Sequence, residues 1–156
     1  MRLLIRPPDV EELPALGELC VRSKAVWGYD AAFMEACKGE LSFDPRDLTS
    51  SRIAVAVRED GVLGVAQVRM VGNDADLLKL FVEPAALRGG VGKALFGWAV
   101  DVAGDMGASR LTIEADPMAA PFYRHLGARD ASLAPSGSIA GRMLPKLVFQ
   151  LQALCP

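Results

Sequence analysis

Leu87-Arg88-Gly89-Gly90-Val91-Gly92-Lys93-Ala94-Leu95 is the stretch that decides the fold of this 156-residue chain. An apolar run typical of a strand, Leu77 to Val82, precedes it, and a segment with helical periodicity follows it. The amides of a glycine-rich turn point toward one spot, and the positive end of the helix dipole adds to the attraction for an anion there. The stretch therefore predicts a phosphate-binding turn between a strand and a helix N-terminus.

The composition limits the classes of protein that this chain can be. With 156 residues, 51% of them hydrophobic, we expect one folded domain over 1–156 with a sizeable core. A net charge of −2 disfavours a general nucleic-acid binder. No apolar run is long enough to span a bilayer, and an arginine interrupts the short apolar start where a signal peptide would need a longer run. We therefore expect a cytoplasmic protein with neither nucleic acid nor membrane as a partner.

Metal and disulfide chemistry are not indicated. The cysteines Cys20, Cys37 and Cys155 are far apart and odd in number, which is untypical of a disulfide framework. His125 is the single histidine, and no cysteines are paired at metal-binding spacing, so we expect no metal site. His125 itself is expected to be an exposed helix residue. The remaining catalytic groups are carboxylates, tyrosine, serine, lysine and the backbone.

Periodicity and turn signals predict a strand, two helices, three strands, a helix, a strand, a helix and two strands. The expected strands are 3–6, 53–57, 62–70, 77–82, 111–115, 128–133 and 143–151, and the expected helices are 10–24, 31–39, 91–106 and 117–126. The three central strands should form an antiparallel meander. The strand 111–115 follows a crossover helix, so it should lie parallel to the strand that ends at Val82.

Four local signals refine these elements. Asp60-Gly61 is typical of a hairpin turn, and Asn73-Asp74 of a second turn. Asp116 is expected to cap the helix that follows it, with Pro117 at the first helical position. Pro145 predicts that at least the start of the last strand lies at a sheet edge.

Three glycine-rich motifs compete for the phosphate-binding turn. A Walker P-loop needs a glycine where Leu87 stands and a serine or threonine where Ala94 stands. A dinucleotide fingerprint needs a glycine or alanine where Leu95 stands, and its strand opens a βαβ unit instead of ending a meander. Both motifs therefore fail at positions that carry their chemistry.

The third motif fits. Gly90-Val91-Gly92 resembles the G-x-G/A core of motif A in the GNAT family of acyl-CoA-dependent N-acyltransferases, and both flanks match as well. The stretch from Asp116 to Ala128 resembles motif B of that family, N-x-x-A-x-x-F/L-Y-x-x-x-G-F. The element order also matches, so the resemblance covers nearly the whole chain. Two departures are Leu87, where the family has Gln or Arg (here displaced to Arg88), and Asp116 in place of asparagine.

The resemblance implies an α/β (α+β) GNAT fold: a mixed, mostly antiparallel sheet of about six or seven strands, splayed at the acyl-CoA site and flanked by about four helices. It implies acetyl-CoA (coenzyme A) as the cosubstrate, held by the turn without a metal. The residues that it implies for cosubstrate binding are Leu80, Phe81, Val82, Leu87, Arg88, Gly89, Gly90, Val91, Gly92, Lys93, Asp116, Ala119 and Phe122.

Acyl transfer from a thioester to a primary amine needs a base, a donor to the carbonyl oxygen and an acid for the thiolate. By resemblance, Tyr123 is the acid, although a lone tyrosine at this spacing could equally pack on the core face of its helix. The Val82 amide is the implied donor to the carbonyl oxygen. Asp76 and Glu83, at the two ends of the preceding strand, are the candidate bases, and a water chain is the alternative.

The acceptor is expected to bind at residues 23–30, where the family places a helix-loop-helix. Trp27 and Tyr29 would form an aromatic wall, or Trp27 would fill the core under the loop, and Lys24 would meet an acidic group. The acceptor is a small-molecule or peptide amine, and a homodimer is compatible with the resemblance. A non-catalytic acyl-CoA sensor on the same fold is the alternative function. A metal-dependent nucleotide enzyme is disfavoured because the P-loop hydroxyl is missing.

Overall fold

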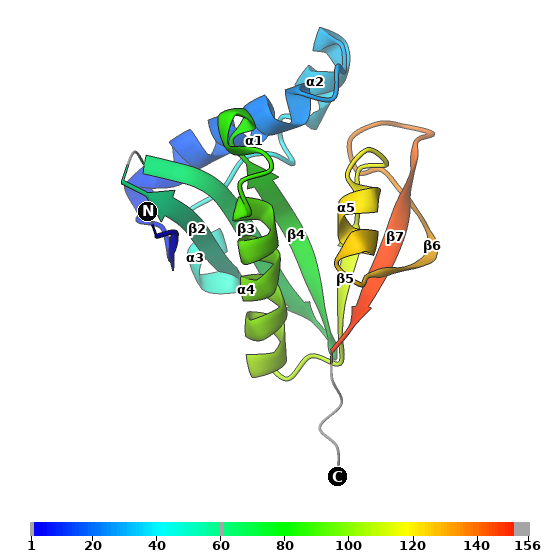
Figure 1. The fold of residues 1–156 in the computed structure, drawn as a ribbon. Coiled ribbons are helices and arrows are strands. Elements are labelled where there is room, and N and C mark those ends of the chain that lie inside the picture. Colours follow the sequence, from blue (N-terminus) through cyan, green and yellow to red (C-terminus); the bar gives the residue numbers. More distant parts are fainter. Residues whose placement is uncertain (1, 60, 152–156) are drawn as a thin grey trace.

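The computed structural model describes residues 2–59 and 61–151, which form a mixed sheet with helices on both faces (Figure 1). The seven strands lie in the order β1-β2-β3-β4-β5-β7-β6. They are β1 (Leu4–Arg6), β2 (Arg52–Arg58), β3 (Gly61–Val71), β4 (Asp74–Val82), β5 (Arg110–Glu114), β6 (Arg129–Pro135) and β7 (Met143–Gln150). The α-helices are α1 (Leu13–Ala25), α2 (Ala31–Cys37), α3 (Asp47–Ser50), α4 (Val91–Asp105) and α5 (Ala120–His125), and 3-10 turns cover Val10–Glu12 and Pro84–Ala86.

The expected meander and crossover are both present. Strands β2, β3 and β4 are joined antiparallel, and β4 and β5 are parallel across the α4 connection. The last two strands form an antiparallel hairpin in which β7 pairs with β5, so β6 is the outer strand. The sheet is therefore mixed and mostly antiparallel, as predicted.

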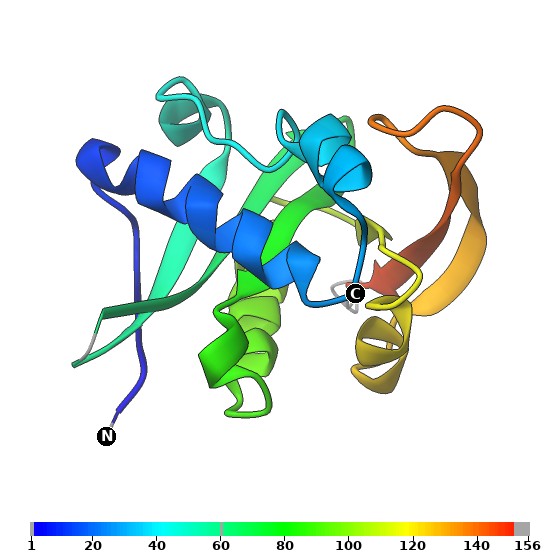
Figure 2. The same ribbon diagram turned by 90° about the horizontal axis from the view of Figure 1, so that it is seen from above.

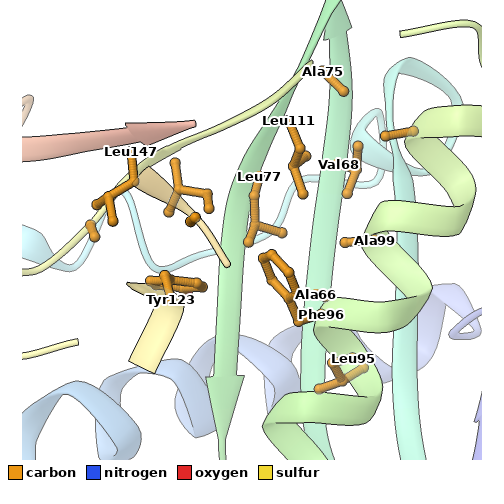
Figure 3. Packing of buried hydrophobic residues seen from close by; sticks show 14 of the residues in the cluster. Ala66, Val68, Ala75, Leu77, Leu95, Phe96, Ala99, Leu111, Tyr123 and Leu147 are labelled. Atoms are coloured by element: carbon orange, nitrogen blue, oxygen red, sulfur yellow. The ribbon is translucent and has the colours of Figure 1, made fainter. Parts of the chain in front are cut away.

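Two hydrophobic clusters hold the two helix layers to the sheet. On one face, Leu95 and Phe96 of α4 pack with Val68 and Leu77, as Figure 3 shows. On the other face, buried leucines of α1 such as Leu16 pack on β2 and β3. The apolar periodicity of each helix is what turns one of its sides toward the sheet. The glycine-rich turn at the start of α4 is thereby fixed against β4.

The parallel pair β4–β5 is short, and this opens the sheet. Pairing covers only Asp74–Asp76 with Arg110–Thr112, after which the two strands diverge (Figure 1). A β-bulge accompanies the divergence: Leu77 opposes Val68 and Lys79 opposes Gln67, so Leu78 has no partner on β3. A bulge bends its strand and shifts the faces of the side chains that follow. The bulge therefore helps turn β4 away from β5.

Several local predictions were wrong or incomplete. Pro145 is not at a sheet edge, because β7 lies between β5 and β6 and the Pro145 carbonyl accepts from the Ala115 amide at 2.9 Å. The strand β4 begins at Asp74, so the preceding turn lies earlier than expected. The short helix α3 was not predicted. The predicted hairpin turn includes Asp60, and Cys155 belongs to the C-terminal end; both lie outside the described residues.

The helix after β5 also begins later than predicted. The Asp116 carboxylate accepts from the Met118 amide at 2.8 Å, and the Asp116 carbonyl accepts from the amides of Ala119 and Ala120. Asp116 thus caps a turn, and the regular helix starts at Ala120 with Pro121 in its first turn. This extra turn places Asp116 at the end of β5, facing the gap between the strands.

Candidate active site

A cavity of about 660 Å³ occupies the gap between β4 and β5. Four segments form its walls: β4, the turn into α4, the end of β5 with α5, and the C-terminal end of α1. The predicted site residues that line it are Lys24, Trp27, Leu80, Phe81, Val82, Leu87, Arg88, Gly90, Gly92, Lys93, Asp116, Ala119, Phe122 and Tyr123. A second hollow of about 510 Å³ on the outer side of α1 is lined by none of the predicted site residues.

The remaining predicted residues lie beside the cavity without lining it. Gly89 is in the turn, and Val91 is 1% exposed and belongs to the core. Tyr29, Asp76 and Glu83 contact neighbouring side chains that are described below. The structure therefore gathers the predicted cosubstrate residues in one place and separates the two candidate bases from it.

The glycine-rich turn presents free amides at the N-terminus of α4. Arg88 and Gly90 have φ angles of 69° and 83°, in the left-handed region that glycine tolerates best. Among the described residues, no protein acceptor receives the amides of Arg88, Gly90, Val91, Gly92 or Lys93. Unpaired amides at a helix start attract an anion. The turn can thus bind a phosphate through its backbone.

Two glycines keep space open at this turn. A Cβ added at Gly90 would meet no atom within 4 Å, so the turn faces open space. A Cβ added at Gly92 would lie 3.2 Å from the Phe122 ring, so any larger residue would push this ring away from its present position. The exposed side chains of Leu87 and Arg88 both line the cavity. Arg88, which stands one residue after the position where the family has Gln or Arg, therefore still lines the cavity.

The edge of β4 beyond the bulge has backbone groups that face the gap. The Glu83 amide donates to the Leu63 carbonyl on β3 at 2.7 Å. Successive amides of a strand point to opposite edges, so the Val82 amide points away from β3 and into the gap. The geometry suits the role that the resemblance implies for Val82, a donor to a carbonyl oxygen.

Tyr123 sits at the base of the cavity on α5. It is only 6% exposed, its ring packs at 5.8 Å from Phe96 and 5.1 Å from Phe122, and it lies beside the core cluster (Figure 3). No hydrogen-bond partner for its hydroxyl exists among the described residues. Burial raises the pKa of Tyr123 above that of a free phenol. The side chain therefore belongs to the core and also presents a protonated, unengaged hydroxyl to the cavity.

Asp116 joins three segments at the rim of the cavity. Its carboxylate accepts from the Lys24 ammonium at 3.1 Å and from the Tyr29 hydroxyl at 2.7 Å, and Arg142 donates to Tyr29 at 2.8 Å. The Arg142 guanidinium lies 3.5 Å from the carboxylate. The α1–α2 loop and the β6–β7 connection thus meet above the gap, and Figure 2 shows this approach. We call Lys24, Tyr29, Asp116 and Arg142 the rim cluster.

The rim cluster alters the expected roles of its members. Burial alone would raise the pKa of Asp116, but hydrogen bonds from Tyr29 and Met118 and the charge of Lys24 outweigh it and hold the pKa low. Burial and the neighbouring carboxylate raise the pKa of Tyr29 to about 12. The Tyr29 ring stacks on Phe33 at 3.9 Å. Lys24 and Tyr29 therefore have partners inside the protein, and the Asp116 charge is compensated.

The two candidate bases differ in their surroundings. Both Glu83 oxygens accept from the Arg22 guanidinium at 2.8 Å, and this pairing holds the pKa of Glu83 low. Asp76 lies where β4 still pairs with β5, and it accepts a hydrogen bond from the Thr112 hydroxyl. A carboxylate held by an arginine is a weak base. Trp27, by contrast, is 42% exposed and lines the cavity, so it does not fill the core.

Sequence reasoning missed several residues of the site. Among them, Cys37, Glu40 and Lys79 line the cavity on its α1 side, and Arg142 belongs to the rim cluster. The only sequence feature that could have indicated any of them is Lys79, a charged residue within the apolar run 77–82. Glu40 and Arg142 lie in connections whose pattern says nothing about where they fold.

Within residues 2–59 and 61–151, no group of three or more His, Cys, Asp and Glu side chains is arranged to hold a metal ion. No helix in the same ranges has the length and apolar character needed to cross a bilayer.

Comparison with known proteins agrees with this geometry. The family described as Acetyltransferase (GNAT) domain matches residues 49–127, half of the chain, from within α3 to Gly127 of motif B. No curated protein matches the chain by sequence.

Solved structures match over nearly the full length. The PaiA N-acetyltransferase from Thermoplasma acidophilum, in complex with coenzyme A, has a TM-score of 0.77 at 18% identity, over 96% of this chain and 99% of that one. A GCN5-related N-acetyltransferase from Rhodopseudomonas palustris has a TM-score of 0.78 at 22% identity, over 97% of both chains. N-acetylglutamate synthase from Neisseria gonorrhoeae, complexed with coenzyme A and N-acetyl-glutamate, has a TM-score of 0.70 at 19% identity, over 98% of this chain and 36% of that one. The expected fold is thereby confirmed.

Proposed function

Because this chain belongs to the GNAT acetyltransferase family, we propose that it transfers an acetyl group from acetyl-CoA to a primary amine by direct attack within a ternary complex. One observation carries the proposal. The free amides of the turn, the gap-facing edge of β4 and the unengaged hydroxyl of Tyr123 border a single cavity of about 660 Å³. Acyl transfer needs a site that holds the acyl donor, a hydrogen-bond donor to the carbonyl oxygen and an acid for the leaving group. The turn, the edge of β4 and Tyr123 could supply these in that order.

The residues present suit coenzyme A as the donor. The amides from Gly90 to Lys93 would hold its pyrophosphate, and the open space at Gly90 leaves room for it. The Arg88 and Lys93 side chains line the same end of the cavity and add positive charge. Leu80 to Val82 offer backbone partners for the amide groups of pantetheine, as an added strand would use them.

In the chemical step, different groups of the protein act on the carbonyl and on the sulfur of the thioester. The Val82 amide donates to the thioester oxygen as negative charge develops there. The amine nitrogen forms the new bond to the carbonyl carbon, and the carbon–sulfur bond breaks. Tyr123 donates its proton to the departing thiolate, and its raised pKa keeps the hydroxyl protonated for this task. The amine loses its own proton to a base.

Three carboxylates compete for the role of base. Glu40 and Glu114 line the cavity, whereas Asp76 lies just outside it and would act through a water molecule. Glu83 is less suitable because Arg22 holds both of its oxygens. Cys20 is no rival nucleophile, because it does not line the cavity and burial raises its pKa to about 12, which disfavours a thiolate.

The test is a panel of amines with acetyl-CoA, in which release of free thiol is followed over a range of pH. We expect turnover with some amines, and Tyr123→Phe should lower kcat by about tenfold or more, as general acids do. Its unfolding free energy should change by less than about 1 kcal/mol, because the hydroxyl has no hydrogen-bond partner among the described residues to lose.

Glu40→Gln, Glu114→Gln and Asp76→Asn identify the base, since only the true base carries the acidic limb of the pH profile. Unchanged kcat in Tyr123→Phe at every pH would remove the acid assignment.

The same assay distinguishes the alternative function. Tight binding of acetyl-CoA without thiol release from any amine would indicate a non-catalytic sensor. The unengaged Tyr123 hydroxyl at the cavity favours the enzyme, since a sensor needs no acid there.

A further inference from the structure

Lys79 places an ammonium group in the cavity on the side of α1. It follows the bulge at Leu78, so its side chain projects toward the α1 face of the sheet. Its Nζ lies 4.6 Å above the Phe43 ring and donates to the Gln67 Oε1 at 3.0 Å. Lys79 lines the cavity together with Glu40. The charge is thus held in a defined position and is open to a ligand.

A chain of hydrogen bonds fixes the partner of this ammonium. Gln67 is 2% exposed, and its Nε2 donates to the Ser51 Oγ at 3.0 Å. The Ser51 hydroxyl in turn donates to the Asp47 carbonyl at 2.6 Å. Because the Gln67 nitrogen is engaged by Ser51, its oxygen is left for Lys79. The built-in partner of the cation is therefore a neutral amide with a fixed orientation.

Lys79 has donors to spare and no anion to receive them. An ammonium has three N–H groups, and Gln67 accepts one of them. Among residues 2–59 and 61–151, no carboxylate lies within salt-bridge distance of Lys79. Burial lowers the pKa of Lys79 by more than Cys20, Asp47 and Glu40 raise it. A partly buried cation without a counter-ion costs stability unless a ligand supplies the anion.

We propose that Lys79 binds a carboxylate of the acceptor, so that the acceptor is an amine which also carries a carboxylate, as an amino acid does. The two free N–H groups of Lys79 pair with the acceptor carboxylate. Glu40, on the same side of the cavity, offers the opposite charge for the acceptor amine. The amine part of this inference rests on the proposed acetyl transfer, whereas the carboxylate anchor rests on Lys79 alone. A single lysine with one neutral partner suits a monoanion better than a phosphate, which needs several donors.

The experiment compares amino acids with their matched amides, which lack the carboxylate but keep the amine. We expect the wild-type kcat/KM to favour the acids at least tenfold, since hydrogen bonds to charged groups are strong. In Lys79→Met this preference should fall to near one. Lys38→Met, which removes an exposed lysine on the other side of α1, should keep the wild-type preference. An equal preference in Lys79→Met and wild type, or none in wild type, would overturn the proposal.

A binding measurement keeps this inference separate from the proposed function. N-acetylated amino acids and their amides are titrated into the protein saturated with coenzyme A, and we expect at least tenfold tighter binding of the acids, lost in Lys79→Met. If no amine is acetylated but this contrast is present, acetyl transfer fails and the anchor stands. If amines are acetylated and the contrast is missing, the anchor is wrong and acetyl transfer stands. Thermal melts confirm that the variant folds, and a wild type without the contrast would overturn the proposal even if the variant did not fold.

Discussion

At the residue scale, Asp116 occupies the asparagine position of motif B, but its carboxylate pairs with other side chains of the protein. Sequence comparison with motif B suggested that its charge would lie near the cosubstrate. The structure surrounds it with Lys24, Tyr29 and Arg142, from three separate segments. With two cations close to one carboxylate, its charge is offset inside the protein. Its main effect is thus to hold the α1–α2 loop and the β6–β7 connection together at the rim.

Replacing Asp116 by asparagine, the usual residue of the motif, should therefore destabilise this chain. Lys24 and Arg142, with side chains 13% and 19% exposed, would lose their shared anion, at a cost of about 1–3 kcal/mol. The Asp116 pKa is held low, so its contribution is present above the unfolded pKa of ~3.9 and is lost as pH falls through the lower folded value. Urea unfolding should show a difference in unfolding free energy between wild type and variant at pH 7 that narrows as the pH falls below ~3.9. Asp101→Asn, at an exposed position of α4, is the control. A difference in unfolding free energy that does not depend on pH would contradict the electrostatic role of the rim cluster.

At the element scale, β4, the glycine-rich turn and α4 act as one unit. The β4 bulge bends the strand, the turn reverses into α4, and the helix buries Leu95 and Phe96 against the sheet it has just left. Because α4 is anchored by this packing, the free amides at its start are aimed at the gap before any ligand arrives. Such preorganisation lowers the cost of binding.

The variant Gly90→Glu tests that unit. Its carboxylate would stand where the pyrophosphate is expected, and the φ of 83° adds backbone strain for any side chain. We expect at least a hundredfold weaker binding of coenzyme A, measured by calorimetry. Gly97→Glu is the matched control, because it puts the same charge on the same helix at an exposed position with open space around it. Equal binding in Gly90→Glu and wild type would exclude the turn as the phosphate site.

At the scale of the whole molecule, the gap between β4 and β5 is the feature on which the proposed function depends. The strands share only three register pairs before they part, and helices on both faces keep the two halves of the sheet in place. A ligand that lies along β4 and reaches the turn would bridge the two halves. Binding should therefore stabilise the entire fold.

Acetyl-CoA should raise Tm as a result. At a ligand concentration of about 100 times Kd, linkage adds about 2.7 kcal/mol, which corresponds to roughly 5–10 °C for a chain of this size. Differential scanning fluorimetry measures the shift directly. Magnesium and ATP are the control, because a metal-dependent nucleotide enzyme would respond to them and a GNAT domain should not. A shift with magnesium and ATP but none with acetyl-CoA would contradict the donor assignment.

Most of the element order could be predicted from sequence, because periodicity and turn chemistry are local. The helix at 91–106, the meander and the parallel β5 were all predicted, and each depends on short-range pattern or chain handedness. Pro145 shows the limit of such reasoning. Proline favours an edge, but whether its strand is at an edge depends on where β6 packs, which is a long-range contact.

The site divides in the same way. Gly90-Val91-Gly92 and Tyr123 were enough to indicate the family and the proposed cosubstrate end of the cavity, since a backbone cradle and a motif tyrosine are encoded in neighbouring residues. Only the tertiary structure decided which residues form the side of the cavity where we propose that the acceptor binds. The splay of β4 from β5 brings Lys79 and Glu40 into one cavity, and folding pairs Asp116 with Lys24, 92 positions away in the chain. Charges that meet across such distances in sequence leave no periodic trace, because their partners are chosen by packing.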